Sequence, residues 1–438
     1  MRPSLDPSRL LFIASLAMLA FLYGFAASAR GWFPNALLVE AWHQGSSVLK
    51  AEVPHFLQPP IYEFHGVRAS HPDRMQPGYT FVSSMQRTGE TWGPQLRLID
   101  AAGRTVHEWP VDTYAVFEGV RPGHPAYGVN LNAAAIHGAE VLPNGDLVFN
   151  YETLATLRID ACGEVLWHRP YGSHHSLAPA DDGSFWISAH FDTAQERRFA
   201  GLGRPSIQDR ILHVDAGGDI IGEIDVLELL FENGLEYKLA RSRGFGLKQD
   251  PTHINDVEPL GESLAAQYPM FEAGDLMLSL KRLDLVLIVD PESGRVKWYY
   301  DERLHAQHDP DFLGDGWIGI FNNRPDGTPR GTLLGGSEIL AVHPATDSVR
   351  VLFPTPASDP FYTAYMGKWQ PLPNGNLLLV EAVPGRVVET GPDGETIWEW
   401  VQQPTEMNGE PWVPHVSDAV RYDFDPDRIR SWPCSSLE

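Results

Sequence analysis

Cysteine is nearly absent from this 438-residue chain, which contains only Cys162 and Cys434. The two positions match neither zinc-ligand spacing nor a C-x-x-C redox motif, which argues against a zinc-ribbon or thioredoxin-like protein. Two unpaired thiols are the simpler expectation. A disulfide between them is the alternative in an oxidising compartment.

Basic residues are also few. The chain has 33 Lys and Arg against 57 Asp and Glu, a formal net charge of −24. Binding to nucleic acid depends on basic patches that neutralise phosphates, so this balance argues against a nucleic-acid partner. It does not exclude a small anionic substrate in a locally basic pocket.

Charge is missing from one long apolar run, Leu10–Ala29. Twenty uncharged residues can cross a bilayer as a helix. Arg2 and Arg9 precede the run, so the positive-inside rule places the rest of the chain outside the cytoplasm. Ala27-Ser28-Ala29 resembles a signal-peptide cleavage site, which makes secretion after cleavage the alternative to a membrane anchor. Both interpretations export the main domain to the periplasmic or extracellular side.

Turn-forming residues are plentiful, with 40 Gly and 36 Pro, and 43% of the chain is apolar. This composition is typical of a turn-rich β protein with a large core. We divide the chain into residues 1–30 as anchor or signal segment, 31–70 as juxtamembrane connector, and 71–438 as the main domain.

A histidine followed eight positions later by a glycine recurs along the main domain. Each glycine follows Asn, Asp or Leu. Asn-Gly and Asp-Gly favour tight hairpins, so each segment predicts strand, turn and strand. A fifth segment has glycine in place of the histidine. The segments are His137–Gly145, His175–Gly183, His253–Gly261, His308–Gly316 and Gly367–Gly375.

A second repeat accompanies the first: a strand, a short glycine-containing turn that usually starts at Asp, and a strand that is rich in aromatic residues near its end. Its six copies occupy residues 96–109, 157–167, 211–224, 286–298, 339–353 and 387–400. Two hairpins per unit give four strands, and six such units predict an all-β, six-bladed β-propeller behind the N-terminal transmembrane helix. A β-sandwich is the alternative. We expect residues 411–438 to pack on the first unit or to close the ring.

The innermost strand of a propeller blade lines the central channel, so the four histidines should form part of a ring at one mouth. Lys281 and Arg282 are expected on the second strand of the His253 unit, and Arg324 on the corresponding strand of the His308 unit. Any one of these residues could be structural. Together they suit three roles: transfer of an anionic group through a nucleophilic imidazole, metal binding, or non-catalytic anion binding. The neighbouring cations disfavour a metal.

Several motifs occur in a fixed order: HPDRMQPGYTFVSS from His71, HINDVEP from His253, SLKRLDLVLIVDPESGRVKW from Ser279, QHDPDFLGDGWIGIFNN from Gln307 and QPLPNGNLLLVEAVPGRVVETGPDGETIWEW from Gln370. Over roughly residues 65–425 the chain resembles the bacterial PAPS-independent arylsulfotransferases. The resemblance implies a six-bladed propeller that moves a sulfuryl group from a phenolic sulfate ester to another phenol. It implies a sulfated histidine and no nucleotide donor or other cofactor.

Carried over by motif, the resemblance makes His308 the nucleophile. His253 and Asn255 would bind the sulfuryl oxygens, and His137 or His175 would assist. The family motif SLRNL is SLKRL here, so Lys281 stands at the arginine position, and either it or Arg282 supplies the charge. Further candidates for substrate contacts are Arg324 and Asn322.

We therefore expect an arylsulfotransferase that acts on phenolic sulfates and phenols, without a metal. The alternatives are a non-catalytic propeller that binds an anionic aromatic ligand or partner, and a metal-dependent enzyme built on the histidine ring. The sequence leaves the donor, the acceptor and the oligomeric state open.

Overall fold

The computed structural model describes residues 7–30, 53–121, 125–126, 129–190, 208–241 and 250–437. It contains two compact units, Met1–His55 and Phe56–Glu438. In the first unit, α1 (Pro7–Arg30) includes the stretch Pro7–Ala26, whose mean hydropathy of 1.9 and length would allow it to cross a membrane. The predicted N-terminal apolar helix is therefore present. Residues 31–52 of the expected connector lie outside the described residues.

In the described part of the second unit, antiparallel sheets of four or five strands follow one another along the chain. The first sheet contains β28 (Val416–Tyr422), β3 (Tyr79–Thr88), β4 (Thr91–Ile99) and β5 (Thr105–Trp109). The second contains β6 (Ile136–Val141), β7 (Leu147–Tyr151), β8 (Ala155–Ile159) and β9 (Val165–Arg169). The third contains β10 (Ser173–Pro179), β11 (Phe185–His190), β12 (Asp209–Val214) and β13 (Ile220–Asp225). The fourth sheet contains β14 (Ile254–Pro259), β15 (Leu276–Leu280), β16 (Leu285–Asp290) and β17 (Arg295–Tyr300). The fifth contains β18 (His308–Gly314), β19 (Trp317–Asn322), β20 (Glu338–His343) and β21 (Ser348–Phe353). The sixth contains β22 (Trp369–Pro371), β23 (Leu377–Glu381), β24 (Arg386–Thr390), β25 (Thr396–Val401) and β2 (Gly66–Ala69).

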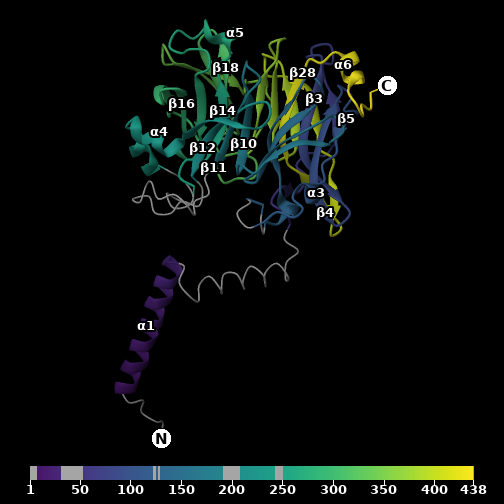
Figure 1. Ribbon diagram of the computed structural model, residues 1–438. Helices are drawn as coiled ribbons and strands as arrows, with labels where there is room; N and C mark the ends of the chain where they lie inside the picture. The colour runs from purple at the N-terminus through teal and green to yellow at the C-terminus, as the bar shows by residue number, and fades with distance from the viewer. Residues whose placement is uncertain are drawn as a thin grey trace. The chain divides into compact units, whose positions relative to one another are not determined.

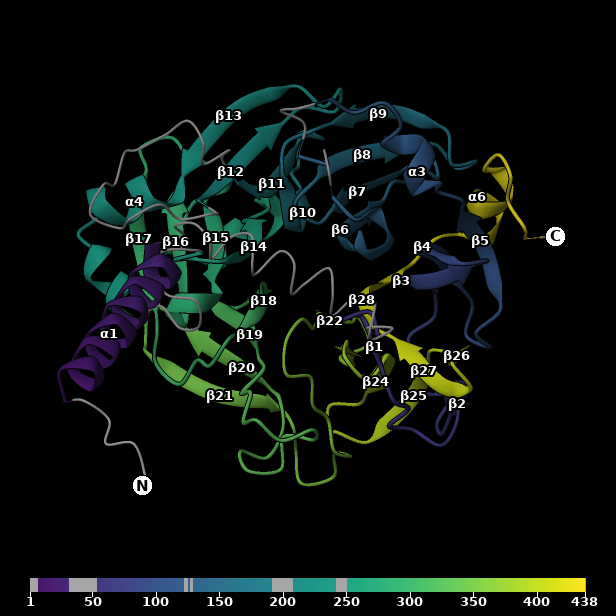
Figure 2. The same ribbon diagram turned by 90° about the horizontal axis from the view of Figure 1, so that it is seen from below.

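The sheets are arranged as a ring. Figure 2 shows the inner strands β6, β10, β14, β18, β22 and β28 nearest its centre. Strand β10 contacts both β6 and β14, and β28 contacts both β6 and β22. This is the predicted β-propeller, with the first strand of each hairpin repeat on the inside.

The second sequence repeat forms the turn between the third and fourth strands of each sheet. Asp100 Oδ1 accepts hydrogen bonds from the backbone N–H groups of Ala102 and Arg104, each at 2.9 Å. The Asp160 and Asp215 turns repeat this pattern with their own second and fourth residues. An Asp side chain that satisfies two turn N–H groups explains why the repeat begins at Asp.

Apolar residues fill the spaces between neighbouring sheets. Clusters lie between the first and second sheets around Phe149, between the third and fourth around Leu278, and between the fourth and fifth around Ile320. Further clusters lie between the other neighbours, including the sixth and first sheets, where Trp398 packs near Val82. Burial at about 25 cal/mol per Å² of apolar surface therefore holds the ring together at every junction.

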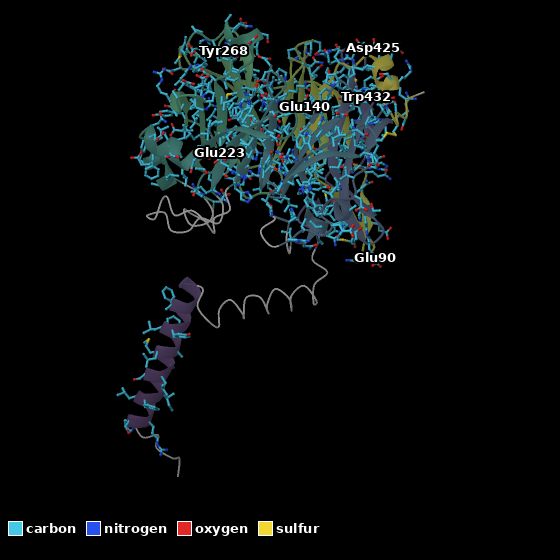
Figure 3. The ribbon with its side chains drawn as sticks, in the orientation of Figure 1. Glu90, Glu140, Glu223, Tyr268, Asp425 and Trp432 are labelled. Atoms are coloured by element: carbon cyan, nitrogen blue, oxygen red, sulfur yellow. A yellow bond between two sulfur atoms is a disulfide. The ribbon has the colours of Figure 1, made fainter. Side chains whose placement is uncertain are left out.

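The C-terminal segment closes the ring. Strand β28 pairs with β3, and Figure 1 shows these distant parts of the chain side by side. Beyond it, α6 (Pro426–Ser431) and Trp432, labelled in Figure 3, pack into the core between the first two sheets. The expectation that the tail packs on the first unit or closes the ring is correct.

Cys162 and Cys434 form a disulfide. The expectation of two unpaired thiols was wrong, because closure of the ring brings the C-terminal tail beside the turn between β8 and β9. That proximity arises from folding and has no local signature in the sequence.

The remaining elements are short. They are β1 (Leu57–Gln58), β26 (Thr405–Met407), β27 (Glu410–Pro414), α3 (Thr113–Val116), α4 (Val226–Glu232), α5 (Glu262–Ala265), and the 3₁₀ turns η1 (Leu131–Ala133), η3 (Glu236–Arg241) and η4 (Lys281–Leu283). Strand β1 pairs with β27, and β2 adds a fifth strand beside β25. Residues that the sequence analysis placed in the connector thus contribute strands to the second unit.

Candidate active site

A histidine lies at, or within two residues of, the start of five inner strands in the described residues. Four are the predicted His137, His175, His253 and His308; the fifth is His415, just before β28. The imidazole centroids of His137 and His175 are 5.0 Å apart, and those of His175 and His253 are 4.8 Å apart. The shared hairpin register therefore brings the side chains of His137, His175 and His253 together in space.

The backbone at these positions is unusual. His175 and His253 have φ angles of +52° and +50°, which non-glycine residues seldom adopt. Gly138, beside His137, has φ +69°, and a Cβ there would lie 2.1 Å from the carbonyl oxygen of His175. Glycine at 138 thus permits the close approach of β6 and β10 that sets the two histidines side by side.

His308 is held in one tautomer by Asn323. The amide nitrogen of Asn323 donates to the carbonyl oxygens of Thr363 (3.0 Å) and Met366 (2.6 Å). Its Oδ1 must therefore face Nδ1 of His308, 2.6 Å away. Because Oδ1 can only accept, Nδ1 of His308 carries the hydrogen and Nε2 keeps its lone pair.

His308 is also kept uncharged. Burial, followed by the charge of Lys281, holds the pKa of His308 well below its ordinary value, and the hydrogen bond to Asn323 only partly opposes this. Only 5% of the residue is exposed. At neutral pH, His308 therefore presents a neutral imidazole with a free Nε2, which is the nucleophilic form.

His253 is oriented by Asp250. Its Nδ1 lies 2.5 Å from Oδ2 of Asp250, which also accepts from Nε of Arg282 at 3.2 Å. Burial raises the pKa of Asp250, but His253 and then Arg282 outweigh it and bring the pKa to about 2. Nε2 of His253 is buried without a hydrogen-bond partner. An unsatisfied buried nitrogen on the ring is suited to contact a bound ligand.

Lys281 is the cation shared by the ring. Its charge lowers the pKa of each of the four predicted histidines. Strand β15 ends at Leu280, so Lys281 and Arg282 lie in η4 and not on the strand as expected. Burial, then Arg282, lowers the pKa of Lys281 itself. Arg282 pairs with Asp250 at 3.2 Å.

Three predicted contact residues have other partners. Asn255 donates to the carbonyl oxygen of Gln307 at 2.8 Å, so it positions the residue before His308. Asn322 accepts from the N–H of His305 and donates to Glu338, and Arg324 pairs with Glu338 at 3.4 Å. Both side chains thus hold the loops next to β19 and β20, and their contact with a substrate stays a prediction.

The sequence analysis missed other members of the site. Asn323 is the neighbour of Asn322 in the FNN motif. His174 precedes His175, and its Nδ1 lies 3.1 Å from Nδ1 of that residue. Asp209, on β12, lies 3.2 Å from Nε2 of His174. The adjacent histidines were a visible signal, whereas contacts between sheets leave none in the sequence.

The channel beyond the histidines is acidic. The pairing of β6, β14, β18 and β28 with the neighbouring strand shifts register close to each histidine. One inserted residue reverses the alternation of a strand, so the residue three positions later also faces the channel. A cavity of about 310 Å³ there is lined by Glu140 (labelled in Figure 3), Asp256, Glu258, Asp309, Asp311, Asp418 and Lys368.

Five of these carboxyl groups have a raised pKa because of burial: Glu140, Asp256, Glu258, Asp311 and Asp418. Burial raises the pKa of Asp256 to about 7 and of Glu258 to about 8. Lys368 pairs with Asp309 and lies 3.7 Å from Asp256. In the described residues, no group of three or more His, Cys, Asp and Glu could hold a metal ion.

The comparison with protein families decides the assignment. The family model described as arylsulfotransferase (ASST) matches residues 138–403, which is more than half of the chain. The chain belongs to the arylsulfotransferase family. In this family member, the matched segment contains His175, His253, Lys281 and His308, and it begins one residue after His137. No curated protein matches the chain.

Solved structures resemble this arylsulfotransferase-family chain at low identity. A Bacteroides caccae protein of unknown function is 13% identical, with a TM-score of 0.46 over 78% of this chain and 98% of that one. TolB from Acinetobacter baumannii is 13% identical, with a TM-score of 0.43 over 78% and 66%. The WD40 β-propeller domain of Doa1 is 12% identical, with a TM-score of 0.40 over 86% and 97%.

Proposed function

We propose that this protein transfers a sulfuryl group from a phenolic sulfate ester to a phenolic acceptor through a covalent intermediate on His308, without a nucleotide donor. The observation that carries the proposal is the fixed tautomer of His308, whose Nδ1 donates to Asn323 so that Nε2 keeps its lone pair. The family assignment supports the same class of reaction.

In the first half-reaction, Nε2 of His308 attacks sulfur, the bond between sulfur and the phenolic oxygen breaks, and the electron pair leaves on that oxygen. Positive charge develops on the imidazole, and Oδ1 of Asn323 stabilises it through Nδ1–H. Lys281 and His253 face the sulfuryl oxygens and offset their charge, as donors do in other group transfers.

In the second half-reaction, a neighbouring histidine takes the proton of an acceptor phenol, and the phenolic oxygen attacks the sulfur of sulfo-His308. The sulfur–nitrogen bond breaks and its electron pair returns to Nε2. The enzyme is thereby restored, which predicts ping-pong kinetics with donor and acceptor using the same mouth of the channel.

The test is the release of a chromogenic phenol from its sulfate ester, with and without a second phenol. We expect a burst of about one phenol per protein without acceptor and sustained release with it. Mass spectrometry of quenched protein should find the added group on His308. His308→Ala should abolish both signals, whereas the matched control His213→Ala, on β12, should keep them. Modification of another residue, or binding of aryl sulfates without turnover, would leave the non-catalytic propeller as the better description.

We also propose that the second unit works outside the cytoplasm, anchored by α1 or released after cleavage. Support comes from the apolar helix and from the Cys162–Cys434 disulfide, which is typical of oxidising compartments. A reporter fused after residue 438 that is active only in the cytoplasm would contradict this location. Carbonate extraction of membranes then separates anchored from secreted protein.

A further inference from the structure

A buried histidine, His174, lies beside His175. His174 is 4% exposed, and its imidazole meets that of His175 edge-on, with centroids 5.1 Å apart and planes at 88°. The two Nδ1 atoms are 3.1 Å apart, which is hydrogen-bond distance. Because one of these nitrogens must donate and the other accept, the protonation of His174 and that of His175 are linked.

Asp209 fixes the far side of His174. It is fully buried, and its Oδ2 accepts hydrogen bonds from Thr252 Oγ1 (2.6 Å) and from the N–H of Ile254 (2.7 Å). Its Oδ1 lies 3.2 Å from Nε2 of His174, which is ion-pair distance, and neither of these buried atoms has a hydrogen-bond partner in the described residues. A lone pair on Nε2 would be repelled by a carboxylate oxygen at this distance, so the ion pair favours a hydrogen on Nε2 of His174.

Two states of His174 then set two states of His175. When His174 is neutral, its Nδ1 has a lone pair, so Nδ1–H of His175 donates and Nε2 of His175 is left as a base. When His174 is protonated, its Nδ1–H donates to His175 instead, and Nε2 of His175 carries a hydrogen. With Nδ1 engaged in both states, Nε2 is the nitrogen of His175 that can contact a bound phenol.

We propose that His175, His174 and Asp209 form a proton relay that exchanges one proton with the phenolic oxygen in each half-reaction. This inference rests on the proposed function. In the first half-reaction, the departing oxygen takes the proton from Nε2 of His175. Nδ1 of His175 recovers a proton from Nδ1 of His174, which becomes neutral. In the second half-reaction, the acceptor phenol gives its proton to Nε2 of His175, and the Nδ1 proton returns to His174.

The surrounding charges favour this direction of transfer. Burial lowers the pKa of His174, but Asp209, Asp250 and Glu152 outweigh it and the net pKa is raised. The pKa of His175 is well below its ordinary value because of burial, then because of the neighbouring His253 and His137, His174 and Lys281. The resting proton therefore belongs on His174, beside the buried carboxylate, and not on the imidazole that meets the substrate.

The experiment compares donors whose phenols differ in acidity. His174→Gln removes the relay while keeping a polar side chain of similar length. A donor such as 4-nitrophenyl sulfate releases a stable anion that needs no proton, so its burst should persist. The burst from phenyl sulfate, whose phenol has a pKa of about 10 like Tyr, should slow by about 10²–10⁴-fold. Transfer to phenol should slow likewise and recover as pH rises towards 10.

Three controls make the result decisive. Wild-type protein must show the burst and sulfo-His308. If it shows neither, the proposed function is wrong, and the relay is not what the experiment has tested. His190→Gln changes a partly buried histidine, whose centroid is 6.0 Å from that of His174, and should slow neither donor. Asp209→Asn should reproduce the donor-dependent loss. If His174→Gln folds, as judged by its melting temperature, yet slows both donors equally or neither, the relay is wrong.

Discussion

Nδ1 of His308 donates a hydrogen bond to Oδ1 of Asn323 at 2.6 Å, and this contact decides which nitrogen of His308 can react. In Asn323→Leu, the imidazole can adopt the other tautomer, in which Nε2 carries the hydrogen. We expect kcat to fall by about 10²-fold or more with little change in KM, because a wrong tautomer disables the nucleophile without removing substrate contacts. Steady-state kinetics with a chromogenic aryl sulfate measure this split.

Asn322→Ala is the matched control, because Asn322 bonds His305 and Glu338 and leaves His308 alone. Its loss should lower the free energy of unfolding by about 1–3 kcal/mol and leave the kcat of folded protein unchanged. If Asn322→Ala lowers kcat and Asn323→Leu lowers only the free energy of unfolding, Asn323 does not position His308.

The sequence predicts the positions of the histidines but does not distinguish the roles of Asn322 and Asn323. The hairpin spacing predicted the propeller and the ring of histidines, because a repeated register places equivalent residues at equivalent points. It could not separate Asn322 from Asn323, because only the position where β19 ends decides which one faces His308. His415 was missed because the closing strand β28 is followed by the C-terminal tail and not by a glycine hairpin.

Other parts of the site depend on contacts between separate sheets. Asp209 reaches His174 and Ile254 across a sheet junction, and the register shifts that turn Asp256 and Asp311 into the channel depend on pairing geometry. No local pattern encodes either feature. The disulfide between Cys162 and Cys434 is unpredictable for the same reason.

Lys281 acts on all four predicted histidines, so its charge can be tested through their titration. Lys281→Ala removes a cation that disfavours imidazolium, and the pKa of His308 should rise. The acidic limb of the kcat/KM profile should therefore move to higher pH, and kcat should fall more than KM rises, because the charge matters most in the transition state. Lys281→Arg keeps the charge and adds a planar fork, so it should retain or raise activity.

Arg282→Lys provides the comparison, because Arg282 pairs with Asp250, which also contacts Nδ1 of His253. We expect a smaller shift of the acidic limb than in Lys281→Ala. An unshifted profile in Lys281→Ala would show that Lys281 does not set the charge at the ring.

The Cys162–Cys434 disulfide ties the tail to the second sheet across 272 residues. Cys162→Ser with Cys434→Ser should lower the free energy of unfolding by about 2–5 kcal/mol, because the reduced chain gains loop entropy when it unfolds. Thermal melts with and without reductant provide the measurement. Reductant should destabilise the wild type and leave the double variant unchanged; an equal response of both would mean that the bond does not form in solution.

The acidic channel predicts that stability falls as pH rises from about 7 to 8.5. Glu258 has a pKa of about 8 in the folded protein, raised by burial and by Asp256 and Asp309, against about 4.3 in an unfolded chain. The folded state therefore binds more protons across this interval, so the free energy of unfolding decreases with pH. Asp256, with a pKa of about 7, contributes in the same direction. The buried histidines whose pKa is lowered have the opposite effect on stability. Below about pH 6.5 they are protonated in the unfolded chain but not in the folded protein, so the free energy of unfolding rises with pH in that range.

Glu258→Gln isolates this contribution, because glutamine resembles the protonated acid at every pH. It should change stability little at pH 5 and stabilise the protein at pH 8.5 by on the order of 1–3 kcal/mol, since ionisation of Glu258 is then no longer forced on the buried site. Urea unfolding at both pH values gives the difference. Glu272→Gln, at a side chain that is 83% exposed, is the control and should show no such pH dependence. A Glu258→Gln effect that is constant from pH 5 to 8.5 would show that Glu258 titrates as an ordinary surface carboxylate.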